Sequence, residues 1–209
     1  REFFFYIYIA YSNSSISTFK ISANNKNFKW EDNLLLRKSN SKTETFDILI
    51  FANRNIEHAK IPREIQTIRS YSFHNCKNLR IIEIPTDSKL ISIGDYAFYN
   101  SSISSIKIPQ EVQTIGSCSF YCCHNLQNIE IPTDSKLISI SDYAFYNSSI
   151  STFKIPRDFQ TIGSHSFFSC ENLQNIEIPT DSKLISILDN AFSNSSISTF
   201  KISANNKNF

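Results

Sequence analysis

Cysteine and histidine side chains gather at one place in the sequence, where they could bind a metal ion. Cys118, Cys122, Cys123 and His124 lie within seven residues of one another, and thiolates and imidazoles are ligands that zinc prefers. In the repeats described below, however, the positions of Cys118 and Cys122 are filled by tyrosine, histidine, asparagine or serine, and Cys123 is expected to face inward. For Cys123, which shares its position in the repeat with Cys76 and Cys170, the second interpretation is a small buried hydrophobic residue.

The remaining cysteines and histidines form no pattern typical of catalysis. Cys76, Cys123 and Cys170 recur at one position of the repeat, two coils or about 10 Å apart, which is too far for a disulfide. The odd total of five cysteines indicates no disulfide framework. The four histidines occupy four different positions of the repeat, and the sequence contains no glycine-rich phosphate loop. We therefore expect no enzymatic activity, no catalytic residues and no cofactor; the histidines are His58, His74, His124 and His165.

These residues are positioned by a pattern that recurs along most of the chain. It reads Ile-Pro-x-x-[Ile/Val/Phe]-x-x-Ile-x4-Phe-x-x-Cys-x-x-Leu-x-x-Ile-x-Ile, and its three copies, Ile61–Ile84, Ile108–Ile131 and Ile155–Ile178, start 47 residues apart. A related pattern fills Ile84–Ile108, Ile131–Ile155 and Ile178–Ile202. The period therefore divides into a 23-residue coil, which we name A, and a 24-residue coil, which we name B. A fixed period near 23 residues is the signature of a solenoid.

The chemistry of each repeated position predicts its place in the coil. In Leu79–Ile84 the period of two places Ile82 and Ile84 inward and Ile81 and Glu83 outward, as in a strand. A proline follows each such strand and ends it, because proline has no N–H to donate. One aromatic position predicts a ladder of rings along the coils: Phe73, Phe98, Phe120, Phe145, Phe167 and Phe192.

The fold predicted from this pattern is a repeat solenoid of the leucine-rich repeat type. We expect one parallel β-strand per coil, short turns or 3-10 segments on the opposite side, and little α-helix. A single coil buries too little apolar surface to offset the entropy of ordering it, so the coils must share buried faces.

The pattern also divides the chain. Residues 1–20 align with the back half of a B coil, residues 61–201 contain six alternating coils, and residues 202–209 match the beginning of a second insertion. Residues 21–60 are expected to form an insertion with a β-hairpin, because Leu34–Arg37 and Phe46–Phe51 are strand-like runs around a turn signal. Ser12–Phe28 is identical to Ser193–Phe209 and the chain contains no methionine, so we expect the chain to be a fragment that continues at both ends.

The repeated pattern resembles the leucine-rich repeats of BspA-like surface antigens. The resemblance covers nearly the whole chain from Ser12 and extends to the insertion, in which Asn24–Phe28 and Asp32-x-Leu34-Leu35 are similar to an element of that family. It implies a cell-surface or secreted protein of bacteria or parasitic protists that adheres to host proteins and cells. The family has no common catalytic residues to transfer.

Composition limits the classes of partner. The net charge is +2 and no run of lysine or arginine occurs, so we expect no nucleic-acid partner. The longest apolar run, Phe3–Tyr11, has nine residues, which is too short to cross a bilayer, so no membrane span is expected within this chain. The partner is expected to be a protein, either of a host or a neighbouring surface macromolecule.

The outward positions of the strands are the expected binding face. Glutamate and lysine alternate there from coil to coil, and each glutamate is expected to lie between two lysines about 4.8 Å away on either side. The bland interpretation is a solvated charge ladder that fixes the order of the coils. The functional interpretation is a docking surface composed of Ile81, Glu83, Ser105, Lys107, Asn128, Glu130, Thr152, Lys154, Asn175, Glu177, Thr199 and Lys201.

Four Asn-Ser-Ser triplets, which begin at Asn13, Asn100, Asn147 and Asn194, are acceptors for N-glycosylation. They can equally be polar turns that the B coil repeats. The function that we expect is non-enzymatic adhesion or partner binding at a cell surface. An intracellular interaction scaffold and a structural spacer are the alternatives.

Overall fold

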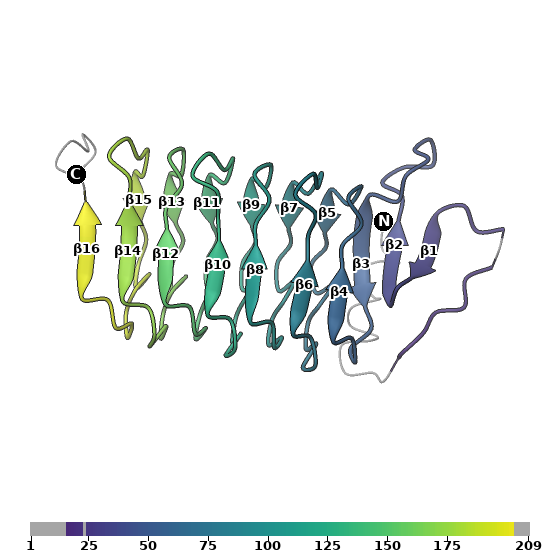
Figure 1. The fold of residues 1–209 in the computed structure, drawn as a ribbon, viewed down its shortest axis with the longest axis horizontal. Helices are drawn as coiled ribbons and strands as arrows, with labels where there is room; N and C mark the ends of the chain where they lie inside the picture. Colours follow the sequence, from purple (N-terminus) through teal and green to yellow (C-terminus); the bar gives the residue numbers. More distant parts are fainter. Residues whose placement is uncertain (1–15, 23, 203–209) are drawn as a thin grey trace.

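The computed structural model describes residues 16–22 and 24–202 as stacked coils without a helix (Figure 1). Of the partial coil predicted at residues 1–20, residues 1–15 lie outside the described residues, as do residues 203–209 of the second insertion predicted at residues 202–209. Each coil contributes an outward-facing strand, and these strands stand side by side in one row along the long axis of the molecule (Figure 1). The predicted leucine-rich repeat solenoid is confirmed.

The strands of this row are the ones predicted from the Ile-x-Ile positions. In all but β10, the central apolar side chain of the strands from β4 to β14 is buried, and the side chains on either side of it are half-buried or exposed. The strands are β4 (His58–Lys60), β6 (Ile81–Glu83), β8 (Ser105–Lys107), β10 (Asn128–Glu130), β12 (Thr152–Lys154), β14 (Asn175–Ile178) and β16 (Thr199–Ile202). We call the outward side of this row the strand face.

Each coil also contains a second, shorter strand that the sequence pattern did not predict. These strands form at the Thr-Ile and Ser-Ile pairs that follow each proline turn, and neighbouring coils pair there in parallel. They are β5 (Thr67–Ile68), β7 (Ser92–Ile93), β9 (Thr114–Ile115), β11 (Ser139–Ile140), β13 (Thr161–Ile162) and β15 (Ser186–Ile187). Together with the N-terminal strands they make a nine-stranded sheet, which we call the second sheet.

The phenylalanine ladder predicted from the sequence is confirmed. Consecutive rings lie nearly parallel, with centroids 4.9–5.3 Å apart and interplanar angles of 0–9°. Every ring from Phe73 to Phe167 is fully buried, while Phe192, in the last described coil, is only half-buried. The ladder therefore forms a continuous apolar wall whose burial depends on a coil on each side.

A three-stranded arrangement closes the N-terminal end of the second sheet. The strands are β1 (Phe28–Glu31), β2 (Leu34–Arg37) and β3 (Ile48–Ala52), and β2 pairs antiparallel with both neighbours. Asp32 and Asn33 make the β1–β2 turn with φ angles of 48° and 65°, a left-handed conformation that these residue types tolerate. Because β3 pairs in parallel with β5, the hairpin joins the solenoid directly.

Arg54 lies at the same end of the molecule, next to the first coil of the phenylalanine ladder. Ala52 N–H donates to the carbonyl of Ser72 at 2.9 Å, so this alanine stands where the next coil places Phe73. The guanidinium of Arg54 lies 4.3 Å from the ring centroid of Phe51, and its Nη1 donates to the Ser72 carbonyl at 2.8 Å. The guanidinium thus covers Phe51, which belongs to the small N-terminal apolar cluster, while it satisfies a backbone carbonyl of the first ladder coil.

Candidate binding surface

The strand face presents the residues that the sequence predicted for it. Glu83, Lys107, Glu130, Lys154 and Glu177 are all exposed, and their strands hold them at matching positions of neighbouring coils. A second column lies two residues before these charged side chains in each strand. Its first member here, Ile81, is apolar and 52% exposed, and the others are polar: Ser105, Asn128, Thr152, Asn175 and Thr199. The backbone of Lys201 pairs with that of Glu177, and its side chain lies outside the described residues.

The row of strands is interrupted between β6 and β8 and between β10 and β12, where a coil of type B follows a coil of type A, while β14 and β16 stay paired at the third such junction. Backbone pairing joins β4 to β6, β8 to β10, and β12 to β14 and β16, but β10 is not paired with β12. A groove of about 500 Å³ lies across this interruption. It is lined by Ser105, Ile106, Lys107, Asn128, Ile129, Glu130, Ile131, Thr152 and Lys154.

The ion pairs of the strand face are one-sided, which corrects the expectation that each glutamate lies between two lysines. Glu130 is 3.1 Å from Lys107 of the preceding coil, and Glu177 is 3.2 Å from Lys154. No ion pair within the described residues joins Glu130 to the following Lys154. The interruption between β10 and β12 accounts for this, because the strands that carry these two side chains are not hydrogen-bonded to each other.

A second set of ion pairs runs along the turns that follow the prolines, which we call the loop edge. Lys136 is 2.6 Å from Glu111, Lys183 is 2.6 Å from Asp158, and Lys89 pairs with Glu64. These pairs link each A coil to the B coil that follows it, whereas the strand-face pairs link each B coil to the A coil that follows. The two edges therefore alternate, and together they connect every described coil from β4 to β15.

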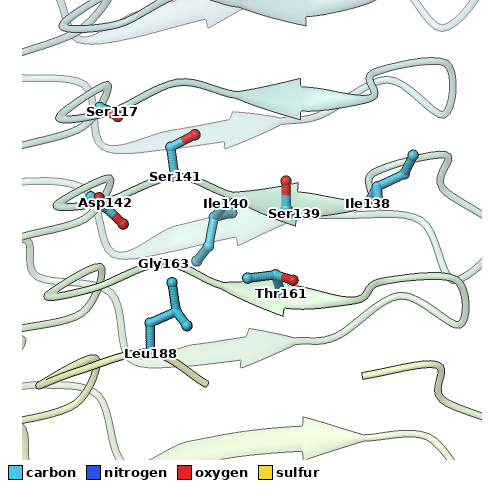
Figure 2. Close-up of a pocket in the computed structure, with 9 residues that line it drawn as sticks. All are labelled: Ser117, Ile138, Ser139, Ile140, Ser141, Asp142, Thr161, Gly163 and Leu188. Atoms are coloured by element: carbon cyan, nitrogen blue, oxygen red, sulfur yellow. The ribbon is translucent and has the colours of Figure 1, made fainter. Parts of the chain in front are cut away.

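The second sheet carries a shallower hollow of about 420 Å³ (Figure 2). Figure 2 shows Ser139 and Thr161 on neighbouring strands, with Ile138 at one end of the hollow and Leu188 at the other. The carboxylate of Asp142 already takes part in a hydrogen bond, because its Oδ1 accepts the backbone N–H of Ser164 at 2.8 Å. It is lined by Ser117, Ile138, Ser139, Ile140, Ser141, Asp142, Thr161, Gly163 and Leu188.

The cysteines that resembled a metal site point to separate neighbours. The Cys123 thiol donates to the carbonyl of Phe98 at 3.1 Å, while Cys122 accepts from Asn147 Nδ2 at 3.6 Å. Burial raises the pKa of Cys123 to about 12, so its thiol is protonated at neutral pH and is a poor metal ligand. Among the described residues, no three His, Cys, Asp or Glu side chains are grouped to hold a metal ion. Cys76, Cys123 and Cys170 are fully buried, as the second interpretation predicted.

The histidines lie in four different surroundings. His58 Nε2 is 2.8 Å from Glu83 on the strand face, and the exposed His124 accepts a hydrogen bond at its backbone carbonyl from Ser149. His74 and His165 stack on the rings of tyrosines in neighbouring coils. None lies within a hydrogen-bonded Ser-His-Asp or Cys-His arrangement of the described chain.

The Asn-Ser-Ser triplets lie in left-handed turns of the B coils. Asn100, Asn147 and Asn194 have φ angles of 52–57°, which asparagine adopts more readily than most residues. Nδ2 of Asn100 donates to Oδ1 of Asn75 at 2.8 Å, so the amide nitrogen that would carry a glycan is already engaged with the preceding coil. Asn13 lies outside the described residues.

Two further columns of the repeat, an outer ring stack and a row of exposed isoleucines, were not predicted from the sequence. The residue after each ladder phenylalanine from Phe73 to Phe167 belongs to an outer ring stack with centroids 4.5–5.1 Å apart. Its first member, His74, is buried, and the others, Tyr99, Tyr121, Tyr146 and Phe168, are half-buried. Exposed isoleucines recur on the second sheet of every B coil, at Ile91, Ile138 and Ile185. Both columns repeat with the coil period, and that repetition was the signal available in the sequence.

Comparison with known proteins identifies the class to which this array belongs. The sequence pattern described as "BspA type Leucine rich repeat region" matches residues 44–139 and 91–209 in six copies. The matched ranges cover well over half of the chain. The protein therefore belongs to the BspA type leucine-rich repeat family, as the repeat pattern predicted.

Solved structures show the same fold. A leucine-rich repeat protein from Bacteroides ovatus is 22% identical with a TM-score of 0.60, over 90% of this chain and 59% of that one. One from Eubacterium ventriosum is 25% identical with a TM-score of 0.58, over 86% and 53%. The pneumococcal vaccine antigen PcpA is 18% identical with a TM-score of 0.55, over 73% and 49%. The chain thus spans about half to three-fifths of these proteins, and no curated protein sequence matches it.

Leucine-rich repeat arrays of this family are consistent with a role in protein interaction and are typically non-enzymatic. The described residues include no helix that could cross a membrane.

Proposed function

We propose that this protein is a binding scaffold of a cell surface, or a secreted one, that contacts a partner protein through its strand face. The observation that carries the proposal is the groove across β8, β10 and β12, which combines exposed charges with a partly exposed apolar floor at Ile129. The groove is presented by a stacked array that holds its side chains at fixed spacing. Surface localisation and adhesion are supported by membership of the BspA type family and by the resemblance to its surface antigens.

The chemistry of the groove favours a protein partner. Lys107, Glu130 and Lys154 offer both charge signs, and Ser105, Asn128 and Thr152 offer hydrogen-bond donors and acceptors that suit a polypeptide. Because the exposed charges alternate in sign along the face, no positive stripe exists there for a nucleic-acid backbone.

Two variants that each neutralise one surface ion pair test the proposal. Lys107→Ser with Glu130→Ser removes a pair on the strand face, whereas Glu111→Ser with Lys136→Ser removes a matched pair on the loop edge. Neither double change alters the net charge. The fluorescently labelled chain would be bound to intact epithelial cells and to a panel of immobilised extracellular-matrix proteins, and binding measured for both variants.

We expect the strand-face variant to lose most of the binding and the loop-edge variant to keep it, with melting temperatures close to the original. Equal binding by all three proteins would remove the strand face as the contact surface. No binding to cells or matrix proteins by the original chain would favour a spacer or an intracellular scaffold.

A further inference from the structure

The charges of the strand face form an ordered series. From β4 to β14 the outermost charged side chains are lysine, glutamate, lysine, glutamate, lysine and glutamate, one per strand. They are Lys60, Glu83, Lys107, Glu130, Lys154 and Glu177. All six are exposed, so the series is available to another molecule.

An alternating series has a specific symmetry about an axis that lies midway between two of its strands. A two-fold axis that runs parallel to the strands, between β8 and β10, reverses the order of the coils and keeps the column in place. In a second copy facing the first, Lys107 then meets Glu130, Glu83 meets Lys154, and Lys60 meets Glu177. Every lysine of one copy faces a glutamate of the other, which is the self-complementarity that a two-fold interface requires.

The neighbouring column does not obstruct such an approach. Under the same rotation Ser105 meets Asn128, and Ile81, the one large apolar side chain among these four, meets the smaller Thr152. The groove of about 500 Å³ over β8, β10 and β12 lies beside this axis and leaves room for the long lysine side chains of a second copy.

The one-sided ion pairs leave each central charge with an open side. Glu130 is paired with Lys107 at 3.1 Å and has no ion pair on the β12 side, although a carboxylate can accept several hydrogen bonds. At the two-fold axis the lysine of a second copy would provide the missing partner. The four central charges would then alternate in sign around the axis.

We propose that two copies of this chain bind each other through their strand faces, with the axis between β8 and β10. The proposal rests on the proposed function in that it uses the same face, and it names the partner as a second copy. Because surface charge pairs contribute little energy each, the ladder selects the partner and sets the alignment. The association should weaken as salt is raised.

Two single substitutions give a decisive test with the full chain. Glu130→Lys places lysine against lysine at the axis of a symmetric pair, and Lys107→Glu places glutamate against glutamate. Each variant alone should self-associate roughly tenfold or more weakly than the original in sedimentation velocity. An equimolar mixture of the two variants should recover the association, because every central contact is then between opposite charges.

Matched controls separate this mechanism from other causes. Glu111→Lys and Lys136→Glu make the same changes on the loop edge and should leave self-association unaltered. Circular dichroism of each variant verifies the fold. If a single variant does not fold, Glu130→Ser and Lys107→Ser remove the same charges without repulsion and should each weaken the association.

Three results would overturn the proposal. The original chain could remain monomeric at every concentration, the strand-face variants could associate as well as the original, or the mixture could fail to recover what the variants lost. Association that resists both salt and these substitutions would arise instead from the apolar end at Ile187, Leu188 and Phe200. Binding to cells or matrix proteins is measured separately, so any of these results leaves the proposed function standing.

Discussion

The phenylalanine ladder and the strand face are built on opposite plans. The ladder repeats one residue type in all six coils from Phe73 to Phe192, and each ring stacks on the next. The strand face alternates lysine with glutamate, and within the described residues its ion pairs run from a B coil to the following A coil. A uniform interior column stabilises any stacking order equally well, whereas an alternating exterior column distinguishes one order from another.

The largest expected effect is in the ladder. Phe120→Ala removes a fully buried ring between two stacked neighbours and leaves a cavity, which should lower the free energy of unfolding by about 3–5 kcal/mol. Phe192→Ala, at the half-buried end of the ladder, should cost less. Thermal and urea unfolding of both variants measures the difference, and equal losses would contradict a ladder whose strength depends on two neighbours.

The next largest loss of stability is expected where two coils of the second sheet approach each other closely. A Cβ at Gly163 would lie 2.5 Å from the carbonyl carbon of Ser141 in the preceding coil, and that atom belongs to the backbone and cannot rotate away. Gly163→Ala should therefore cost about 1–3 kcal/mol. Ser141→Ala, in the same column of the neighbouring coil, is the control and should be nearly neutral by the same unfolding measurement.

His74 should make the outer ring stack sensitive to pH. Burial, helped by the charges of Arg54 and Lys77, lowers the pKa of His74 to about 4. The unfolded chain, whose histidine has an ordinary pKa near 6.5, therefore binds the proton more tightly than the native protein. The stability associated with the neutral ring is fully present above pH 6.5 and is lost as pH falls towards 4.

The loss should be about 2 kcal/mol, after allowance for solvent screening of the partly accessible ring. His74→Tyr introduces the residue found in the next three coils at this position and should remove this part of the pH dependence. Unfolding by urea at several pH values between 4 and 7 measures it. A variant whose stability still falls with the original slope would show that another group is responsible.

The smallest expected effect is on the strand face. Glu130→Lys should lower stability by about 0.2–1 kcal/mol, because an exposed ion pair contributes little. Adding Lys107→Glu should restore most of the loss, since these two residues form the pair. Adding Lys154→Glu instead should restore less, and equal rescue by the two second changes would show that the ladder is symmetric after all.

The repeat itself made most of the fold predictable. The spacing of isoleucine, proline and phenylalanine was sufficient for the coil period, the outward strand and the stacked rings, because each position has one physical role that recurs in every coil. The two-residue strands of the second sheet, β5, β7, β9, β11, β13 and β15, could not be predicted. A Thr-Ile or Ser-Ile pair is too short to show the alternation of inward and outward side chains that identifies a strand. They exist only because the neighbouring coil offers an aligned partner.

A segment that occurs twice with the same sequence also shows that strand formation depends on the neighbouring coil. Thr199–Ile202 forms β16 because β14 lies beside it, whereas the identical residues at 18–21 are not a strand. There the ring of Phe19 packs instead against Trp30 and Phe51, with centroids 5.2 and 5.4 Å away. For the strand face, the sequence predicted which residues would be exposed. It could not predict the one-sided pairing, which depends on where the row of strands is interrupted.

The alternation of ion pairs between strand face and loop edge also restricts how the gene can change length. Loss of one coil, such as residues 85–108, would bring Glu83 beside Glu130 and Glu64 beside Glu111, so that both edges would carry like charges together. Loss or gain of 47 residues leaves every junction as it was. Recombination between such similar repeats should therefore favour steps of two coils, and natural length variants of this array should more often differ by even numbers of coils.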